Sequence, residues 1–208
     1  DCYSCDMTFY NEFAGGYTRM DYIVVEEQIS RMKPQQASYL LAHELFHVLT
    51  RNNPDFREKM YKLIGFSIAP EEFEVPADLR DVLISNPDVN RFDSYARFRI
   101  KGVDRPCAML IYANKPYEGG SFFNYLTIGL MPLKDGKAEQ QDGKTVIYGI
   151  KDAENFFDLV GRNTDYIINP EEILAENFAF LLTRKSVTAN PELIEKMRQA
   201  LQPQAGRH

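Results

Sequence analysis

The feature that most constrains this chain is a short stretch within a helical pattern, His43-Glu44-Leu45-Phe46-His47. Residues four positions apart on a helix lie on one face with their Cβ atoms about 5–6 Å apart, so the two imidazoles can converge on one cation. Glu44 is rotated by about 100° from His43 and can reach a water molecule held by that cation. Because the 208 residues include only three histidines, the arrangement is not expected by chance, and it predicts a metal site.

The helix that carries the two histidines is predicted to run from Pro34 to about Thr50, and its sequence is apolar on nearly every side. We therefore expect it to be largely buried. A buried cluster of two histidines and a glutamate without a metal would leave polar atoms unpaired, which is costly. Neutral imidazoles suit zinc, and an incomplete protein shell leaves a position for water. One zinc ion per chain is the expected cofactor.

The third protein ligand of the zinc has to be a carboxylate. The only other histidine is His208, in a tail that we do not expect to be ordered. The long metzincin motif is excluded, because Thr50 and Asn53 stand where it requires glycine and histidine. The ligand is therefore sought among the downstream acidic residues.

The best downstream carboxylates are Glu172 and Glu176, which lie one turn apart on one face of a predicted helix. Asn169 and Pro170 begin this helix, because asparagine caps free amides and proline suits the first helical position. Either glutamate alone would be interpreted as solvated, but the pair on a largely apolar helix favours a ligand. Asp165 is the main alternative to Glu172.

An HExxH motif followed far downstream by Glu-x-x-x-(Glu or Asp) on a second helix resembles the gluzincins, a class of zinc metallopeptidases. The resemblance implies a zincin-like α+β core, with the active-site helix under a small sheet and a second helix that supplies the third ligand. It implies that His43, His47 and Glu172 bind zinc. It also implies that Glu44 is the general base and that Glu176 is the acidic partner of the first histidine.

The segment Thr164-Asp165-Tyr166, which leads into the helix of Glu172, looks like the anthrax lethal factor type of gluzincin. In that type a tyrosine shortly before a Glu-x-x-Ala-Glu-x-Phe helix stabilises the oxyanion, which implies this role for Tyr166. The residues favour it too, because no free histidine remains and the donor has to be a tyrosine or an arginine. The alternatives are Tyr148, Tyr95 and Arg91.

The chain is expected to form one structural domain in three parts. These are an N-terminal part with the active-site helix (1–66), a β-rich insertion (67–150) and a C-terminal helical part with the third ligand (151–208). The insertion should be ordered and should set access to the cleft. Its predicted strands are Phe98 to Val103, Cys107 to Tyr112, Phe122 to Leu130 and Lys144 to Ile150.

Three further local patterns lead to predictions. Asparagine–proline pairs at Asn53 and Asn190 predict capped helices, like the pair at Asn169. The alternation of basic and apolar residues from Arg97 to Lys101 predicts a strand with one solvated face. In the zincins a strand ahead of the active-site helix pairs with an extended substrate, and Asp21 to Glu26 sits in the corresponding place.

Composition excludes several classes of protein. A net charge of −6 and a pI near 5.2 argue against a general nucleic-acid binder, which needs a surplus of basic residues. No apolar run approaches the roughly 20 residues of a membrane helix.

Cys2 and Cys5 are expected to form a small disulfide or two free thiols, with Cys107 unpaired. An exported location is favoured over a cytoplasmic one.

The expected function is zinc-dependent hydrolysis of a peptide bond in a peptide or protein, with Glu44 as the base for the attacking water. One alternative is a catalytically inactive zinc-bound module that binds a peptide or protein partner, although an intact Glu44 disfavours it. Another is a purely structural metal site, which usually has four protein ligands. The oligomeric state is not predicted.

Overall fold

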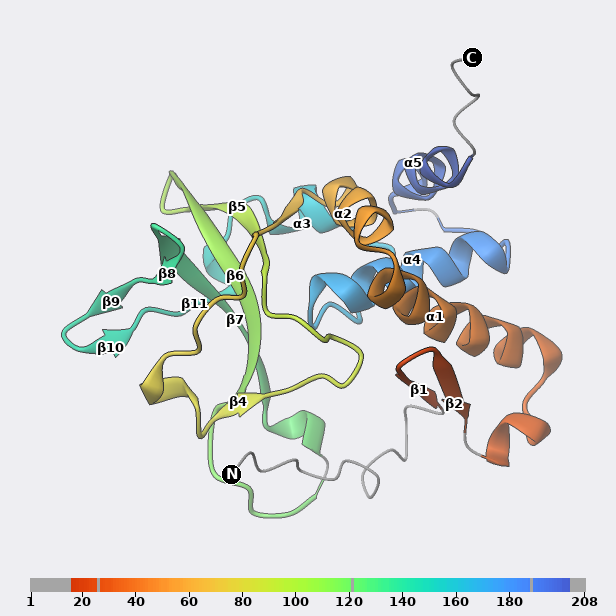
Figure 1. The fold of residues 1–208 in the computed structure, drawn as a ribbon, viewed down its shortest axis with the longest axis horizontal. Helices are drawn as coiled ribbons and strands as arrows, with labels where there is room; N and C mark the ends of the chain where they lie inside the picture. The colour runs from red at the N-terminus through yellow and green to blue at the C-terminus, as the bar shows by residue number, and fades with distance from the viewer. Residues whose placement is uncertain (1–15, 26, 121, 188, 203–208) are drawn as a thin grey trace.

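The computed structural model describes residues 16–25, 27–120, 122–187 and 189–202. A curled antiparallel sheet occupies one side of the molecule and the helices the other, so the predicted α+β class is confirmed (Figure 1). The α-helices are α1 (Pro34–Asn52), α2 (Pro54–Leu63), α3 (Phe156–Val160), α4 (Pro170–Leu182) and α5 (Pro191–Leu201), and the short 3-10 helices are η2 (Glu27–Arg31), η3 (Ala77–Leu79), η4 (Phe122–Asn124) and η5 (Ile150–Asp152).

The main sheet has the strand order β11-β7-β6-β5-β3, with β4 also paired to β6 and β8 to β7. Two separate antiparallel pairs, β1 with β2 and β9 with β10, complete the strands of the described residues. The strands are β1 (Gly16–Arg19), β2 (Tyr22–Val25), β3 (Phe66–Ile68), β4 (Leu83–Ile84), β5 (Ser94–Ile100), β6 (Val103–Ala113), β7 (Leu126–Lys134), β8 (Lys137–Ala138), β9 (Gln140–Gln141), β10 (Lys144–Thr145) and β11 (Tyr148–Gly149).

Three of the four predicted strands are not continuous in the structure. The segment Lys144 to Ile150 forms the short strands β10 and β11 and ends in η5. The segment Phe98 to Val103 crosses a hairpin turn between β5 and β6, where Lys101 and Gly102 adopt φ values of 52° and 75°. This left-handed turn matches the twist of the paired strands and ends β5 at Ile100. The segment Phe122 to Leu130 begins as η4 before β7 starts at Leu126.

Exposed basic and buried apolar side chains alternate along β5, as predicted. Arg97 and Arg99 are exposed, whereas Phe98 and Ile100 are buried against the helices. A strand turns successive side chains to opposite faces, so one face of β5 meets solvent and the other joins the core.

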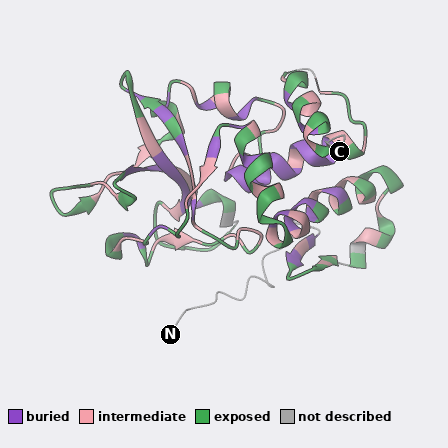
Figure 2. Cartoon of the chain, turned by 45° about the horizontal axis from the view of Figure 1, so that its top comes forward, coloured by how far each residue is buried: buried purple, intermediate pink, exposed green. Residues whose placement is uncertain are grey.

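The main core lies between the sheet and the helices. Phe46 of α1 is fully buried, with its ring centroid 5.4 Å from that of Phe178 in α4 and 5.9 Å from that of Phe56 in α2. Burying one such ring contributes roughly 1.5–3 kcal/mol. Figure 2 shows α4 as a largely buried helix, and ten of its 13 residues are buried. The packing of α1 on α4 thus positions the residues of both motifs.

The expectation that α1 is largely buried on every side is wrong for one face. Leu41 and Leu45 are 42% and 38% exposed, while Phe46 and His47 are completely buried. Among the described elements, α4, α2 and the β1–β2 hairpin pack against α1. The apolar residues on the remaining face therefore stay at the surface.

Only one of the three asparagine–proline pairs caps its helix as predicted. Asn169 Oδ1 accepts a hydrogen bond from the backbone N–H of Glu172 at 3.0 Å, a contact that typically stabilises a helix by about 1 kcal/mol. Asn53 instead turns its amide back to the carbonyl of Leu49, because the end of α1 leaves that oxygen without a partner. Asn190 accepts from the backbone N–H of Arg162.

Several sequence predictions fall outside the described residues. These are the pairing of Cys2 with Cys5 and the position of His208.

Cys107 is buried in the core as a free thiol, and burial raises its pKa to about 12. Among the described residues, no helix is both long and apolar enough to cross a lipid bilayer.

Candidate metal centre

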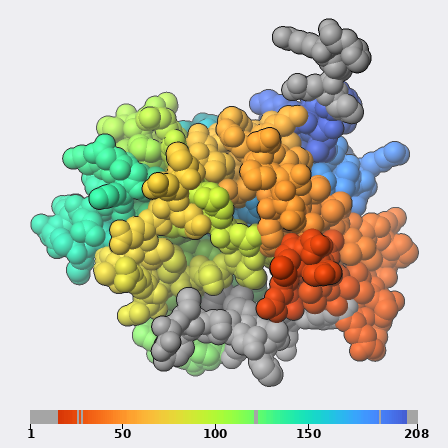
Figure 3. Space-filling model, viewed as in Figure 1, coloured from red at the N-terminus to blue at the C-terminus, as the bar shows by residue number. Residues whose placement is uncertain are grey.

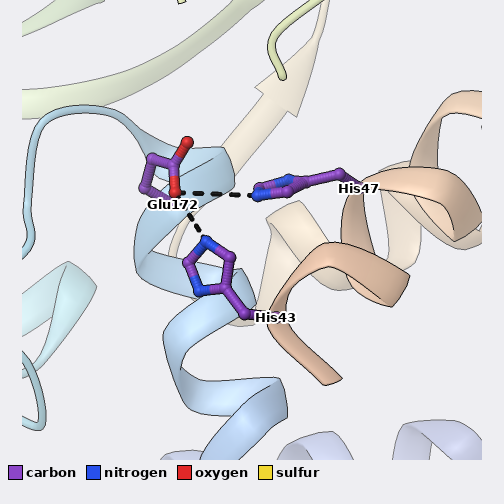
Figure 4. Close-up of side chains that lie close together, drawn as sticks. All are labelled: His43, His47 and Glu172. Carbon is purple, nitrogen blue, oxygen red and sulfur yellow. Dashed lines mark hydrogen bonds and ion pairs between the residues drawn. The ribbon is translucent and has the colours of Figure 1, made fainter. Parts of the chain in front are cut away.

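Helices α1 and α4 bring three predicted metal ligands together in a buried group. Nε2 of His43 lies 3.0 Å from Oε2 of Glu172, and Nε2 of His47 lies 3.6 Å from the same oxygen (Figure 4). The helical spacing of α1 puts both imidazoles on the face that meets α4, and the cap at Asn169 starts α4 three residues before Glu172. The three residues form a group that could hold a metal ion.

The spacing of these atoms is compatible with one bound metal ion. Ligand atoms bound at about 2.0–2.2 Å to one tetrahedral ion lie about 3.3–3.6 Å from each other. Of the two separations from Glu172, the 3.6 Å to His47 is at the upper end of this range and the 3.0 Å to His43 is shorter. Nε2 of His47 is also buried and has no hydrogen-bond partner in the structure. A buried nitrogen without a partner is costly unless a ligand uses it, so the residues fit a metal ion.

The other ring nitrogen of each histidine meets a different glutamate. Nδ1 of His43 lies 3.1 Å from Glu176, and Nδ1 of His47 lies 3.2 Å from Glu171. A neutral imidazole has one N–H donor, so a proton on Nδ1 leaves the lone pair of Nε2 free for a metal. Carboxylates that hold Nδ1–H in this way are typical of histidine ligands in metal sites.

Glu171 is a site residue that the sequence interpretation missed. It is 2% exposed, and its Oε1 faces His47 and accepts from the Thr50 hydroxyl. Its Oε2 accepts from the Tyr61 hydroxyl at 2.7 Å. In the sequence Glu171 stands beside Glu172, and neighbouring residues on a helix point about 100° apart. Only the packing of α2 and α1 around the start of α4 gives both glutamates a place at the site.

The charges of the site are strongly coupled. Burial lowers the pKa of His43, but hydrogen bonds to Glu172 and Glu176 outweigh it and raise the pKa to about 10. Burial raises the pKa of Glu172, but the hydrogen bond to His43 and the charge of His47 outweigh it and lower the pKa to about 2. The ligand carboxylate therefore stays ionised at every physiological pH.

Glu44 lies beside the ligand group with one carboxylate oxygen unpaired. The residue is 3% exposed, and its Oε2 is buried with no hydrogen-bond partner in the structure. Burial and then the charge of Asp88 raise its pKa to about 7, although His43 and His47 act in the opposite direction. A carboxylate with a pKa near neutrality can take up and release a proton.

The strand that lies next to Glu44 is β1, and pairing of the following strand with a substrate stays a prediction. A Cβ on Gly16 would lie 3.4 Å from Cγ and Oε1 of Glu44, so β1 approaches the carboxylate closely. The predicted strand, within Asp21 to Glu26, is β2, and it carries the exposed side chains of Tyr22 and Val24. The hairpin puts β1 at Glu44 because β1 packs with its buried residues on α1.

The β4–β5 segment (residues 85–93) supplies two more residues that sequence reasoning missed. Asn86 donates its side-chain amide to Oε1 of Glu172 at 2.6 Å. Asp88 forms a second possible ligand group with Glu44 and His47. Figure 3 shows the yellow-green end of this segment against the red β1–β2 hairpin, where Thr18 donates to Asp88. No local pattern in the sequence distinguishes these two residues from ordinary turn residues.

Tyr166 lies at the entrance to the site. Its ring centroid is 6.5 Å from that of His43, and the residue is 37% exposed. Burial of its hydroxyl, followed by the charges of Glu172 and Asp88, raises the pKa of the phenol. The phenol therefore remains a neutral hydrogen-bond donor.

The residues considered as alternatives to Glu172 and Tyr166 make other contacts in the structure. Asp165 is exposed and takes part in neither ligand group of the described residues. Arg91 pairs with Asp93 at 3.0 Å, and Tyr95 packs its ring on Phe73. Tyr148 belongs to β11 and packs against the main core.

Comparison with known proteins adds no information about this site. Comparisons with protein-family models, curated proteins and solved structures found no match. What the site does is therefore inferred from its own residues, which combine a three-ligand metal group with an unpaired carboxylate.

Proposed function

We propose that this chain is a zinc-dependent peptidase of gluzincin type. The observation that supports this most is the position of Glu44, which has a buried oxygen without a partner and a carboxylate oxygen within 4.8 Å of a ring nitrogen of His47. A purely structural metal site needs no such carboxylate, whereas hydrolysis needs a base for the attacking water. The substrate class is a peptide or protein, and the zincin-like core is part of the proposal.

Zinc bound by the three ligands would polarise the scissile carbonyl and lower the pKa of a coordinated water towards ~7. Glu44 accepts the proton of the attacking water and delivers it to the leaving amine. Glu171 and Glu176 hold the two imidazoles with Nδ1 protonated, so that each Nε2 keeps its lone pair.

Tyr166 is the proposed donor to the oxygen of the scissile carbonyl. Its phenol stays neutral and stands at the exposed edge of the site, beside His43. Among the described residues its hydroxyl makes no hydrogen bond, which leaves the donor free for a substrate. Donors aimed at a developing negative charge stabilise the transition state.

The test is metal content together with hydrolysis. We expect about one zinc per purified chain by elemental analysis, and cleavage of a denatured protein that a chelator abolishes and added zinc restores. Glu44→Gln is the matched inactive control, because it keeps the volume and removes the basicity. A zinc-bound chain that cleaves no peptide under any condition would favour the inactive binding module over the peptidase.

A further inference from the structure

The two carboxylate oxygens of Glu172 have different partners. Oε2 lies 3.0 Å from Nε2 of His43 and 3.6 Å from Nε2 of His47. Oε1 accepts the side-chain amide of Asn86 at 2.6 Å, and among the described residues it has no other hydrogen-bond donor. Because Glu172 is 2% exposed, solvent does not replace this donor. One oxygen of the predicted ligand is thus directed to the two histidines and the other to the β4–β5 segment.

A tight turn fixes the amide of Asn86. Residues 86–89 form a β-turn in which the carbonyl of Asn86 accepts the backbone N–H of Val89 at 3.0 Å. Asparagine followed by Pro87 is typical of the first two positions of such a turn. Oδ1 of Asn86 also accepts the backbone N–H of Asp88 at 3.0 Å, so Nδ2 is the amide atom that points to Glu172. The backbone of the turn therefore sets the position of this donor.

The turn is also attached to β1 and α1. Oδ1 of Asp88 accepts the backbone N–H of Thr18 at 2.9 Å and the Thr18 hydroxyl. That hydroxyl accepts a hydrogen bond from the guanidinium of Arg51 at 2.8 Å. Asn86 and Asp88 thus connect the turn to α4 on one side and to the β1–β2 hairpin on the other. An amide held in this way keeps its position when the carboxylate of Glu172 changes its contacts.

We propose that Asn86 is a positioning residue that limits Glu172 to one oxygen as a metal ligand. A carboxylate binds a metal ion through one oxygen or through both. At Oε1 the amide of Asn86 competes with an ion, whereas Oε2 faces the two imidazoles. The inference rests on the metal centre of the proposed function and does not depend on the hydrolysis.

The consequence concerns the position that water or a substrate needs. Catalytic zinc sites have three protein ligands and keep a fourth position for water or substrate. His43, His47 and one oxygen of Glu172 supply three ligand atoms. A second oxygen of Glu172 would occupy or crowd the fourth position. The amide of Asn86 thus preserves the position at which the proposed reaction takes place.

A role of Asn86 in folding alone would have different consequences. A buried carboxylate oxygen needs a donor whether or not an ion is bound. A purely structural contact therefore predicts that an Asn86 variant is less stable but keeps the same ligands around its bound metal. A positioning role predicts that the variant still binds metal but loses the open position.

The test probes the open position with azide, a small anion that binds to metal ions. The protein is loaded with cobalt(II), whose visible spectrum changes when a ligand is added. Asn86→Ser keeps an acceptor for the N–H of Asp88, but its hydroxyl ends one atom short of the amide nitrogen. We expect both proteins to bind cobalt, and we expect azide affinity to be about 10–100-fold lower in the variant, the usual effect of losing a partner of a metal ligand.

Two further variants separate the donor from the turn. Asn86→Ala removes the donor and the turn acceptor together, and it should weaken azide binding to the same extent as Asn86→Ser. Asn90→Ser changes an exposed asparagine of the same segment, and its azide affinity should equal that of the parent. Parental azide affinity in cobalt-loaded Asn86→Ser would overturn the inference.

Crystal structures of the zinc-loaded proteins provide a second measurement. We expect one oxygen of Glu172 at the ion in the parent and both oxygens in Asn86→Ser. Two oxygens at the ion in the parent would overturn the inference even if the variant does not fold. One-oxygen binding in a chain that cleaves no peptide would refute the peptidase alone, whereas hydrolysis with both oxygens at the ion would refute the role of Asn86 alone.

Discussion

Asn86 holds one oxygen of the Glu172 carboxylate while the other oxygen faces both histidines. The amide of Asn86 donates to Oε1 at 2.6 Å, and Oε2 lies 3.0 Å from Nε2 of His43. A residue of the β-rich insertion thus orients the predicted third ligand of a candidate metal site built on two helices. The segment that carries Asn86 therefore lies at the predicted ligands, and the access role of the insertion stays a prediction.

Glu172→Ala should strip the metal from the chain. The substitution removes the oxygen that faces both imidazoles, and a site of two histidines binds zinc far more weakly than one of three ligands. Elemental analysis of the purified variant should find much less than one zinc per chain. Asp165→Ala is the matched control and should keep its zinc. Loss of zinc from the control with retention in Glu172→Ala would refute the ligand assignment.

Glu44→Gln should keep zinc and lose hydrolysis. The amide has nearly the same volume but cannot accept the proton, and loss of a general base typically costs ~10²–10⁴ in rate. The measurement is kcat on a peptide substrate, with zinc content determined in parallel. Glu58→Gln, on the exposed side of α2, should retain the parental rate. A Glu44→Gln protein that binds zinc and cleaves normally would remove Glu44 from the mechanism.

Tyr166→Phe should reduce kcat without changing zinc content. Loss of one oxyanion donor typically costs ~10²–10³ in turnover, and the phenol does not contact the metal ligands through a hydrogen bond within the described residues. Tyr148→Phe is the comparison, because that residue packs against the core and should give a near-parental rate. The opposite result would transfer the donor role to Tyr148.

Glu171→Ala should weaken both zinc binding and folding. Without this carboxylate, Nδ1 of His47 and the hydroxyl of Tyr61 lose their acceptor, whereas the Thr50 hydroxyl can still donate to a backbone carbonyl of α1. Loss of a partner that orients a histidine ligand typically costs 10–100-fold in metal affinity. Each buried group left unpaired costs about 1–3 kcal/mol of unfolding free energy.

The consequences of Glu171→Ala can be measured by competition with a chelator and by thermal unfolding. A loss of about 3 kcal/mol should lower Tm by roughly 6–12 °C in a chain of this size. Glu195→Ala removes an exposed glutamate that pairs with Arg198, and it should leave both quantities nearly unchanged. Parental zinc affinity in Glu171→Ala would show that Glu171 does not support His47.

The stabilisation by zinc should increase with pH. In the metal-free chain the pKa of His43 is raised from 6.5 to about 10, so its ion pairs stabilise the fold fully below pH 6.5 and are lost as the pH rises through 10. The pKa of Glu172 is lowered from 4.5 to about 2, so its contribution is present above pH 4.5 and is lost as the pH falls through 2. Zinc has to displace the proton of His43, and its affinity should rise about tenfold per pH unit for each proton displaced.

This pH dependence can be followed as the difference in Tm between zinc-loaded and chelator-treated protein. The difference should grow from pH 6 to pH 9, both because zinc binds more tightly and because the metal-free chain loses its ion pairs. A difference that is constant over this range would show that His43 carries no proton for zinc to displace.

Local geometry is what the sequence determined. The four-residue spacing of His43 and His47 and that of Glu172 and Glu176 follow from the helical repeat, which needs no knowledge of the rest of the chain. The start of α4 at Asn169 and Pro170 is likewise a property of neighbouring residues. These patterns were sufficient to predict the ligand group that the structure brings together.

The tertiary structure alone decided which further residues reach that group. Glu171 comes from the start of α4, and Asn86 and Asp88 from the β4–β5 segment, where no periodic pattern distinguishes them. The approach of β1 to Glu44 is likewise a result of the packing. Their positions depend on how the hairpin, the β4–β5 segment and α2 pack around α1 and α4. That packing is the sum of many weak contacts between residues far apart in the chain, so it cannot be deduced from any one segment.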